Sequence, residues 1–231
     1  MNEDFLAGRS IIVFGGTGAL GGAVVETARA RGAMVTVAST TTPEESVRHS
    51  DVRYVSVDAL DEQSVASCFA SLEGSPWAVV NLIGGYTGPH AFVDLDLSVL
   101  RRQLDLNLMT AAAITKYAVK SITEGARGGR IVHTSSRVAT EDGHNGFSYS
   151  VSKLAVVRLV EAVAAEVRDD AITVNCVMPS IIDTPSNRAS MPTADHDTWP
   201  KASQIADVIM FLVSDDAELV SGAAIPVYGR A

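Results

Sequence analysis

The chain has few positive charges and no cluster of them. Its 231 residues carry 18 Lys and Arg against 27 Asp and Glu, which gives a formal net charge of -9. Nucleic acids and anionic membranes attract proteins through clustered positive charge. The charge pattern therefore argues against a nucleic acid or a membrane surface as partner.

Long apolar runs and cysteines are also scarce. No uninterrupted apolar run is long enough to span a bilayer, and Met1–Phe5 lacks the basic start and apolar core of a signal peptide. Two isolated cysteines, Cys68 and Cys176, cannot build a disulfide framework, so we expect buried free thiols in a reducing cytoplasm. The five histidines show no ligand spacing, and no metal site is expected.

What the chain does have is a regular alternation of β-rich and helical segments, with 47% hydrophobic residues and a mean hydropathy of +0.19. The expected strands are Ser10–Phe14, Met34–Ala38, Val52–Val57, Trp77–Ile83, Arg130–Thr134, Ile172–Val177 and Ala223–Val227. The expected helices are Ala19–Arg31, Glu62–Leu72, Leu97–Ile122, Ser148–Arg168 and Gln204–Val213. Such alternation predicts an α/β fold, a Rossmann-type doubly wound parallel sheet of about seven strands with helices on both faces. Residues 1–231 fit one domain, with a short link at Pro43–His49 and one long loop at Pro179–Lys201.

A glycine-rich turn separates the first strand from the first helix. It reads Gly15-Gly16-Thr17-Gly18-Ala19-Leu20-Gly21. Gly15 allows a tight turn, Gly18 lets the backbone approach a pyrophosphate, and Gly21 permits close packing of helix on sheet. The turn predicts nucleotide binding, in preference to a flexible turn without a ligand. Gly22 stands where a P-loop would need its lysine, so that motif is excluded.

Three polar residues form the second pattern with chemical meaning. Tyr149 and Lys153 are four residues apart and share a helix face, and Ser136 lies thirteen residues before Tyr149 at the end of a strand. A nearby ammonium and the helix dipole would lower the phenol pKa from its usual value of about 10 toward neutrality. The spacing alone would indicate a surface pair, but the glycine turn upstream favours a redox site in which Tyr149 moves a proton.

These motifs together resemble the short-chain dehydrogenase/reductase family over essentially the whole chain. Its Tyr-x-x-x-Lys matches Tyr149 to Lys153, its catalytic serine matches Ser136, and its proton-relay asparagine matches Asn107. The resemblance implies further coenzyme contacts at Asp58, Asn81, Gly84, Pro179, Ile182 and Thr184, besides the glycine turn, Tyr149 and Lys153. Leu82, Ile83 and Ser180 depart from the family pattern in these segments.

The glycine turn and the long loop resemble one subgroup more closely. Phe14 and Ala19 replace the usual Thr and Gly, as in the Gly-Gly-x-Gly-Ala-Leu-Gly turn of dihydropteridine reductases. Asp183–Asp195 and Trp199 also look like that subgroup. This is evidence of kinship, and it makes quinonoid dihydropterin reduction one alternative, because kinship does not fix the substrate.

The coenzyme preference follows from the end of the second strand. NAD-binding chains place an acidic residue there to bind the ribose 2′-hydroxyl. Here Ser39 and Thr40 stand at that place, with no carboxylate to repel a 2′-phosphate and no Arg following to grip it. We expect NADP(H), with NAD(H) as the alternative.

The sequence thus predicts an enzyme that reversibly reduces a small carbonyl, or a related C=N bond, with NAD(P)H. Tyr149 would supply the proton, Lys153 lower its pKa, Ser136 orient the substrate oxygen and Asn107 hold a water. Alternatives are the pterin reductase and a non-catalytic NADP(H)-sensing regulator, which would not need Ser136, Tyr149 and Lys153. A serine hydrolase is disfavoured because no Gly-x-Ser-x-Gly occurs.

Other residues near the expected pocket carry weaker signals. Arg137 and His144 flank it, and Arg188 in the long loop is the preferred candidate for contact with an anionic or polar substrate. Met191 and Trp199 either line the pocket or fix the loop. The resemblance also implies a homodimer or homotetramer joined through Leu97–Ile122 and Ser148–Arg168.

Overall fold

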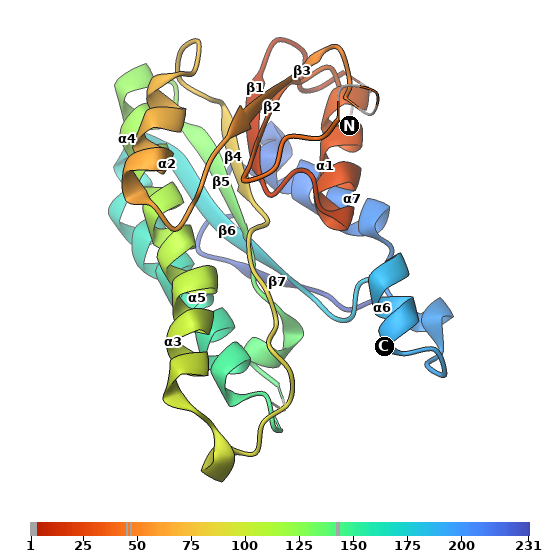
Figure 1. Ribbon diagram of the computed structural model, residues 1–231. Coiled ribbons are helices and arrows are strands. Elements are labelled where there is room, and N and C mark those ends of the chain that lie inside the picture. Colours follow the sequence, from red (N-terminus) through yellow and green to blue (C-terminus); the bar gives the residue numbers. More distant parts are fainter. Residues whose placement is uncertain (1–3, 45, 47, 142–143) are drawn as a thin grey trace.

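The computed structural model describes residues 4–44, 46, 48–141 and 144–231. Its centre is one sheet of seven parallel strands in the order β3-β2-β1-β4-β5-β6-β7 (Figure 1). The strands are β1 Ser10–Phe14, β2 Met34–Ser39, β3 Val52–Ser56, β4 Ala78–Asn81, β5 Gly129–Thr134, β6 Ile172–Pro179 and β7 Ala224–Val227. The predicted seven-stranded, doubly wound α/β fold is confirmed.

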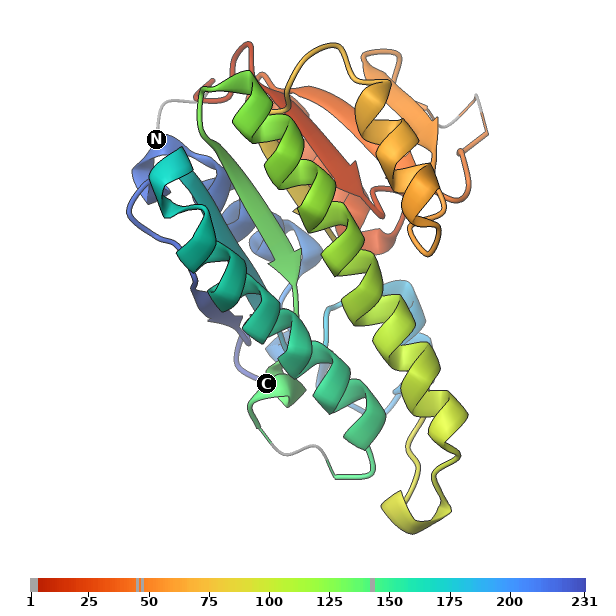
Figure 2. The same ribbon diagram turned by 90° about the vertical axis from the view of Figure 1, so that its left-hand side faces the viewer.

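Helices cover both faces of this sheet. One face carries α1 (Ala19–Ala30) and α7 (Ala202–Val213), which pack against each other. The other carries α2 (Glu62–Ala70), α4 (Thr110–Gly125) and α5 (Phe147–Glu166). Figure 2 shows α4 (green) and α5 (teal) as two long rods that lie over this face of the sheet and run roughly along the strands. The two layers bury separate apolar clusters, one on each side of the sheet.

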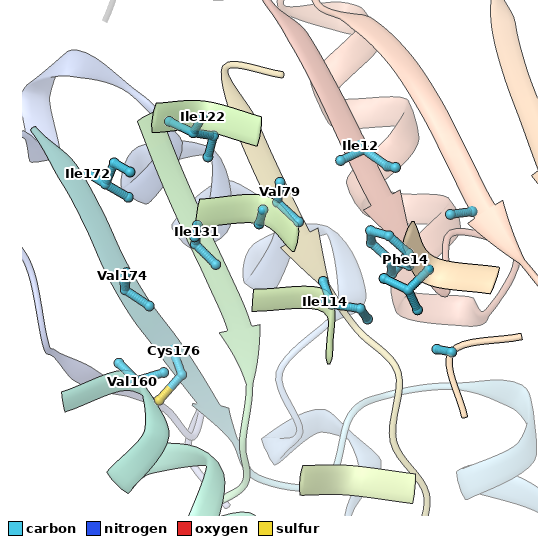
Figure 3. Packing of buried hydrophobic residues seen from close by; sticks show 14 of the residues in the cluster. Ile12, Phe14, Val79, Ile114, Ile122, Ile131, Val160, Ile172, Val174 and Cys176 are labelled. Carbon is cyan, nitrogen blue, oxygen red and sulfur yellow. The ribbon is translucent and has the colours of Figure 1, made fainter. Parts of the chain in front are cut away.

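Alternation along the strands explains these two clusters. Successive strand side chains point to opposite faces, so Ile11 and Val13 enter one cluster while Ile12 and Phe14 enter the other. Ile12 pairs in register with Val79, and the row continues through Ile131 to Val174 (Figure 3). Four neighbouring strands thus present one continuous apolar row to α4 and α5.

The expected unbroken helix over Leu97–Ile122 was wrong at its centre. The structure has α3 (Leu97–Leu104), a π-helical turn η3 (Asp105–Met109) and then α4. A π-turn accommodates one extra residue without ending the rod, and such turns frequently occur at functional sites. Here the turn contains Asn107, one of the predicted site residues.

The expected loop Pro179–Lys201 also contains regular structure. A short helix α6 (Pro185–Ser190) follows β6, and a 3-10 turn spans His196–Thr198. Thr184 caps α6 by accepting a hydrogen bond from Asn187 N at 3.2 Å, and Pro185 occupies the first turn. A cap residue followed by proline is a helix-start signal, so this helix was visible in the sequence.

Other details follow the predictions or lie outside the described residues. Cys68 and Cys176 are buried free thiols, as expected. The predicted link at Pro43–His49 includes Glu45 and Val47, which lie outside the described part of the chain. Within the described ranges, no helix combines the length and apolar character needed to cross a bilayer.

Candidate active site

Several strand ends converge at the carboxyl edge of the sheet. The chain crosses from β3 back to β4, so that β1 has β2 on one side and β4 on the other. In such sheets ligands bind in the crevice at this switch point. A cleft of about 550 Å³ opens here. The predicted site residues that line it are Leu20, Gly84, Ser136, Tyr149, Lys153, Pro179 and Ile182.

The glycine turn lies beside this cleft and begins α1. Gly15 has a φ of +78°, which favours glycine, and a Cβ at Gly21 would collide with the Gly15 carbonyl oxygen and lie 2.7 Å from Gly16. Gly18 is the N-cap residue, with no side-chain cap and no acidic residue in the first turn. The positive helix end is therefore open to an anion. Thr17, Ala19 and Leu20 belong to the same turn, and together these features fit a dinucleotide pyrophosphate.

The predicted adenosine-side residues lie at the ends of the next two strands. Ser39 ends β2, is 8% exposed, and its Oγ lies 2.9 Å from Thr17 Oγ1, which ties β2 to the glycine turn. Thr40 follows Ser39 and is exposed. Asp58 follows β3 and accepts a hydrogen bond from Leu60 N at 3.0 Å. These residues share the edge with the cleft but are not part of its wall.

Tyr149 and Ser136 both line the cleft, and the Ser136 hydroxyl is near enough to the phenol to act on its pKa. The pKa of Tyr149 is raised above its ordinary value of 10 by burial, and Ser136 partly opposes that rise. The nearby Tyr86 raises it further. The expected lowering of this pKa is therefore wrong, because burial outweighs the opposing effect of Ser136.

Lys153 is almost completely buried beneath Tyr149. Its Nζ donates to Thr134 O at 3.0 Å and lies 5.8 Å from the centroid of the Tyr149 ring. The side chain is 4% exposed, and burial lowers its pKa from 10.5 to about 8. The ammonium thus stays charged below about pH 8, at a site where burial disfavours the charge.

Asn107 lies next to Lys153, across Gly84 and Gly85. Its Oδ1 accepts from Gly85 N at 3.0 Å, and its Nδ2 donates to Ser152 Oγ at 2.9 Å. A Cβ at Gly84 would lie 2.6 Å from Lys153 Nζ and 2.7 Å from Asn107 Oδ1. Glycine at position 84 therefore keeps open the space where the two polar groups approach each other.

Asn81 lies behind this site, in a buried network that the sequence did not predict. It accepts from Ile83 N at 3.0 Å and its Nδ2 lies 3.2 Å from His133 Nδ1. His133 Nε2 lies 2.9 Å from Thr115 Oγ1, and that hydroxyl donates to Ala111 O at 2.6 Å. Because the Asn81 amide can only donate to Nδ1, and the Thr115 hydroxyl already donates to Ala111 O, the proton of a neutral His133 is assigned to Nε2. Burial, with the Lys153 charge nearby, lowers the pKa of His133 from 6.5 to about 4.

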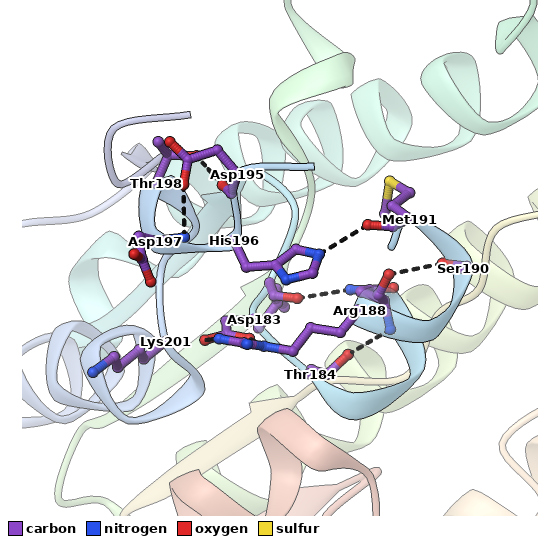
Figure 4. A network of polar contacts seen from close by, with 12 residues as sticks. Asp183, Thr184, Arg188, Ser190, Met191, Asp195, His196, Asp197, Thr198 and Lys201 are labelled. Atoms are coloured by element: carbon purple, nitrogen blue, oxygen red, sulfur yellow. Dashed lines mark hydrogen bonds and ion pairs between the residues drawn. The ribbon is translucent and has the colours of Figure 1, made fainter. Parts of the chain in front are cut away.

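The segment after β6 is held by its own polar contacts (Figure 4). Arg188 binds Asp183 through Nε at 2.5 Å and through Nη2 at 2.9 Å. His196 Nε2 lies 2.8 Å from Met191 O, and its ring packs on Trp199. Trp199 is 6% exposed and fixes the segment, whereas Met191 lines the cleft.

Two residues of the cleft, Tyr86 and Arg137, change which side chains are expected to contact the substrate. Tyr86 lines the cleft and packs edge-on against Tyr149, with ring centroids 5.2 Å apart. Its position directly after Gly84 and Gly85, beyond the end of β4, was a signal that could have identified it. Arg137 also lines the cleft, while Arg188, the preferred cation in the sequence, is paired with Asp183 outside its wall.

Comparisons with known proteins give relatives along almost the full chain. A family model described as Enoyl-(Acyl carrier protein) reductase matches residues 16–229. The (-)-isopiperitenol/(-)-carveol dehydrogenase, mitochondrial, of Mentha piperita is 29% identical over 247 residues, which cover 97% of this chain and 93% of that protein. Cis-4-hydroxycyclohexanecarboxylate dehydrogenase of Sinomonas cyclohexanicum is 29% identical over 246 residues, 99% of this chain and 98% of that protein.

The fold has close counterparts among solved structures. A short-chain type dehydrogenase/reductase from Mycobacterium ulcerans superposes with a TM-score of 0.87 at 26% identity. The match covers 97% of this chain and 90% of that one. The matched backbone therefore spans the strands whose carboxyl ends border the cleft.

Proposed function

The chain belongs to the short-chain dehydrogenase/reductase family and is an NAD(P)-dependent oxidoreductase of small alcohol or carbonyl substrates. From this premise we propose that Ser136, Tyr149 and Lys153 carry the reaction, with Asn107 in support. The observation that carries the proposal is their convergence, beside the glycine turn, on one cleft. We take residues 1–231 as a single coenzyme-binding domain.

Tyr149 delivers the proton in this proposal, while a bound nicotinamide supplies or accepts the hydride. The raised pKa keeps the phenol protonated at neutral pH, which suits it to protonate a carbonyl oxygen during reduction. Ser136 lines the cleft beside Tyr149 and would place the substrate oxygen between the two hydroxyls. In the oxidative direction the phenolate is required, and the Lys153 ammonium stabilises it.

Lys153 also has the position of a coenzyme-binding group. Its buried ammonium lines the cleft next to Gly84, where a ribose hydroxyl can accept from it. Asn107 holds the Gly85 backbone at its N–H and C=O, which keeps this opening in shape. Here Asn107 acts as a positioning residue, and we propose that a water between it and Lys153 connects the site with solvent.

The coenzyme that we propose is NADP(H), with NAD(H) as the alternative. Phosphates would bind at the open start of α1, between Gly15 and Gly21. The Ser39 and Thr40 hydroxyls would donate hydrogen bonds to the 2′-phosphate, and Asp58 would contact the adenine. Asn81, Pro179, Ile182 and Thr184 are assigned to the nicotinamide side, where the buried Asn81 side chain acts through the strand end that it braces.

The substrate class that we propose is a ring ketone or the corresponding secondary alcohol. Two relatives are named for carveol and for cis-4-hydroxycyclohexanecarboxylate, both alcohols on a six-membered carbon ring. A quinonoid dihydropterin is the second candidate, supported by the glycine turn and by Asp183–Asp195, whose sequence resembles dihydropteridine reductases.

Assembly and location complete the proposal. Met109 is 56% exposed on η3 and Leu154 is 47% exposed on α5, so the α4–α5 layer presents apolar groups to water. We propose a homodimer or homotetramer formed through this layer. The two buried free thiols support a cytoplasmic location, although the name of one relative gives a mitochondrial one for that protein. Sedimentation velocity and cell fractionation test these two points.

The test is turnover with NADPH and NADH against 4-oxocyclohexanecarboxylate, carvone and quinonoid dihydropterin. Replacing Tyr149 with Phe should lower kcat by about 10²–10⁴-fold, because the proton donor is lost. Coenzyme affinity, followed by nicotinamide fluorescence, should change little. Tyr117→Phe is the matched control, because that hydroxyl contacts Glu62 on the surface. Wild-type turnover in Tyr149→Phe would refute the mechanism, and coenzyme binding without any consumption would favour the NADP(H)-sensing regulator.

A further inference from the structure

We propose that Arg137 binds a carboxylate of the substrate, so that the cleft selects carbonyl compounds or alcohols that carry one acidic group. The inference rests on the proposed function, because it assigns the substrate class of the same cleft. It differs from the sequence-based assignment, which gave this role to Arg188.

The charges of the cleft wall are the first observation. Among the described residues that line it, Lys153 and Arg137 are cationic and none is acidic. Lys153 is committed to Thr134 O and to the reaction end of the cleft. Apolar groups such as Leu82, Val138 and Ile181 form much of the remaining wall. In a chain of net charge -9, an anionic substrate needs a local positive group, and Arg137 is placed to supply it.

The position of Arg137 relative to Ser136 is the second observation. The two residues are consecutive, and both line the cleft. Ser136 and Tyr149 line the same cleft, and in the proposed mechanism they mark where a carbonyl oxygen would be reduced. A substrate with an apolar body can therefore place its carbonyl at Ser136 and its carboxylate at Arg137.

The backbone segment Tyr228–Ala231 holds the guanidinium in place. Arg137 Nη1 donates to Ala231 O at 2.7 Å, and its Cζ lies 5.6 Å from the centroid of the Tyr228 ring. Tyr228 O in turn accepts from Ser180 Oγ at 2.7 Å, and Arg230 N donates to Thr198 O at 2.9 Å. The segment thus connects Arg137 to the chain after β6, which also lines the cleft.

Among the described residues, Glu141 is the side chain that forms an ion pair with Arg137, and this pair is weak. Glu141 lies 3.5 Å from Nε, and its side chain is 50% exposed, so solvent screens the pair. A guanidinium offers five N–H donors, more than the contacts to Ala231 and Glu141 use. Arg188 differs, because Asp183 already engages two of its nitrogens. Arg137 therefore retains the capacity for a two-point bond to a carboxylate.

The experiment compares cyclohexanecarboxylate with its neutral isostere cyclohexanecarboxamide. Both are titrated calorimetrically into the protein alone and into the protein saturated with NADP⁺. We expect the carboxylate to bind about 10- to 100-fold more tightly, the range of a charge-assisted hydrogen bond. Arg137→Gln should bring the ratio of the two affinities close to one. Arg188→Gln, the matched control, should leave the ratio intact.

A second variant is expected to bind the carboxylate more tightly than the wild type does. Glu141→Gln removes the competing carboxylate and should strengthen carboxylate binding by up to about fivefold, the range for an exposed ion pair. A purely structural role of Arg137 would weaken binding in both variants and for both compounds.

Equal affinity for acid and amide in the wild type, or a ratio that falls in Arg188→Gln instead, would overturn the assignment. Binding is measured without turnover, so failure of the proposed reaction is recognised separately, by the absence of coenzyme consumption with every substrate.

Discussion

Acid should destabilise this protein through His133, an imidazole that is completely buried between Asn81 and Thr115. The folded state keeps this residue neutral, with a pKa of about 4, whereas the unfolded chain protonates it with the ordinary value of 6.5. Between these two values the unfolded state binds more protons than the folded state. The free energy of unfolding should therefore fall as the pH drops from 6.5 to about 4.

The size of this effect follows from the pKa difference. At about 1.4 kcal/mol per unit, a change from 6.5 to about 4 amounts to about 3 kcal/mol of stability. That is a large part of the total stability of about 5–15 kcal/mol that is typical of native proteins. The contribution is fully present above pH 6.5 and is lost below pH 4.

Urea unfolding at a fixed protein concentration, repeated between pH 7.5 and pH 4, measures the change. Carboxylates that titrate in this range also make the free energy of unfolding depend on pH. The informative quantity is therefore the difference between the pH dependence of the wild type and that of His133→Gln. The glutamine amide can accept from Asn81 and donate to Thr115 but takes up no proton. We expect its stability to fall about 3 kcal/mol less over this range. His49→Gln, whose exposed contact with Glu26 is screened by solvent, should differ from the wild type by less than about 1 kcal/mol. Equal slopes for the wild type and His133→Gln would refute the reasoning.

The coenzyme site supports two further predictions. Gly21→Ala should weaken coenzyme binding by more than about tenfold and lower Tm, because its Cβ would collide with Gly15 and Gly16. Its control is Gly22→Ala, where a Cβ meets nothing within 4 Å; this variant should stabilise α1 by about 0.5–1 kcal/mol. Fluorescence titration and thermal unfolding measure both, and equal effects of the two substitutions would contradict the close packing. Ser39→Asp should shift the preference from NADPH to NADH by about 10- to 100-fold, because a carboxylate repels the 2′-phosphate and bonds a 2′-hydroxyl. Ser39→Asn, uncharged and of similar shape, is its control, and an unchanged ratio of kcat/KM in Ser39→Asp would exclude Ser39 from the 2′ position.

The sheet could be predicted because its signal is local and repeated. Alternating apolar strands and longer helical patterns suffice to give the order of elements. Ligands bind at the carboxyl ends of such strands, and this rule brings Ser136 and the glycine turn, which directly follow strands, to one edge of the sheet. The π-turn could not be predicted, because Asp105–Met109 has the same residue types and nearly the same pattern as an α-helix. Only the structure shows that this π-turn carries Asn107, whose side chain is hydrogen-bonded to the Gly85 backbone.

Long-range polar pairing was the other limit. Nothing in the sequence indicates that His133 meets Asn81, since this needs the register between β4 and β5. Likewise, the sequence cannot rank Arg137 against Arg188, because both side chains carry the same guanidinium. Only the structure shows that Arg188 is already paired with Asp183. Helix α6 is different, because its start signal at Thr184 and Pro185 is local and is present in the sequence.

The π-turn also has an evolutionary consequence. One additional residue in a helix rotates everything beyond it by about 100° about the axis. Here α3 packs on α5 before the turn, while α4 packs on α2 after it. Each half is thus in phase with its own neighbour only while the extra residue is present. Deleting one residue from Asp105–Met109 would restore an ordinary helix but turn the buried side of one half toward water, so neither half can lose the insertion without repacking the layer.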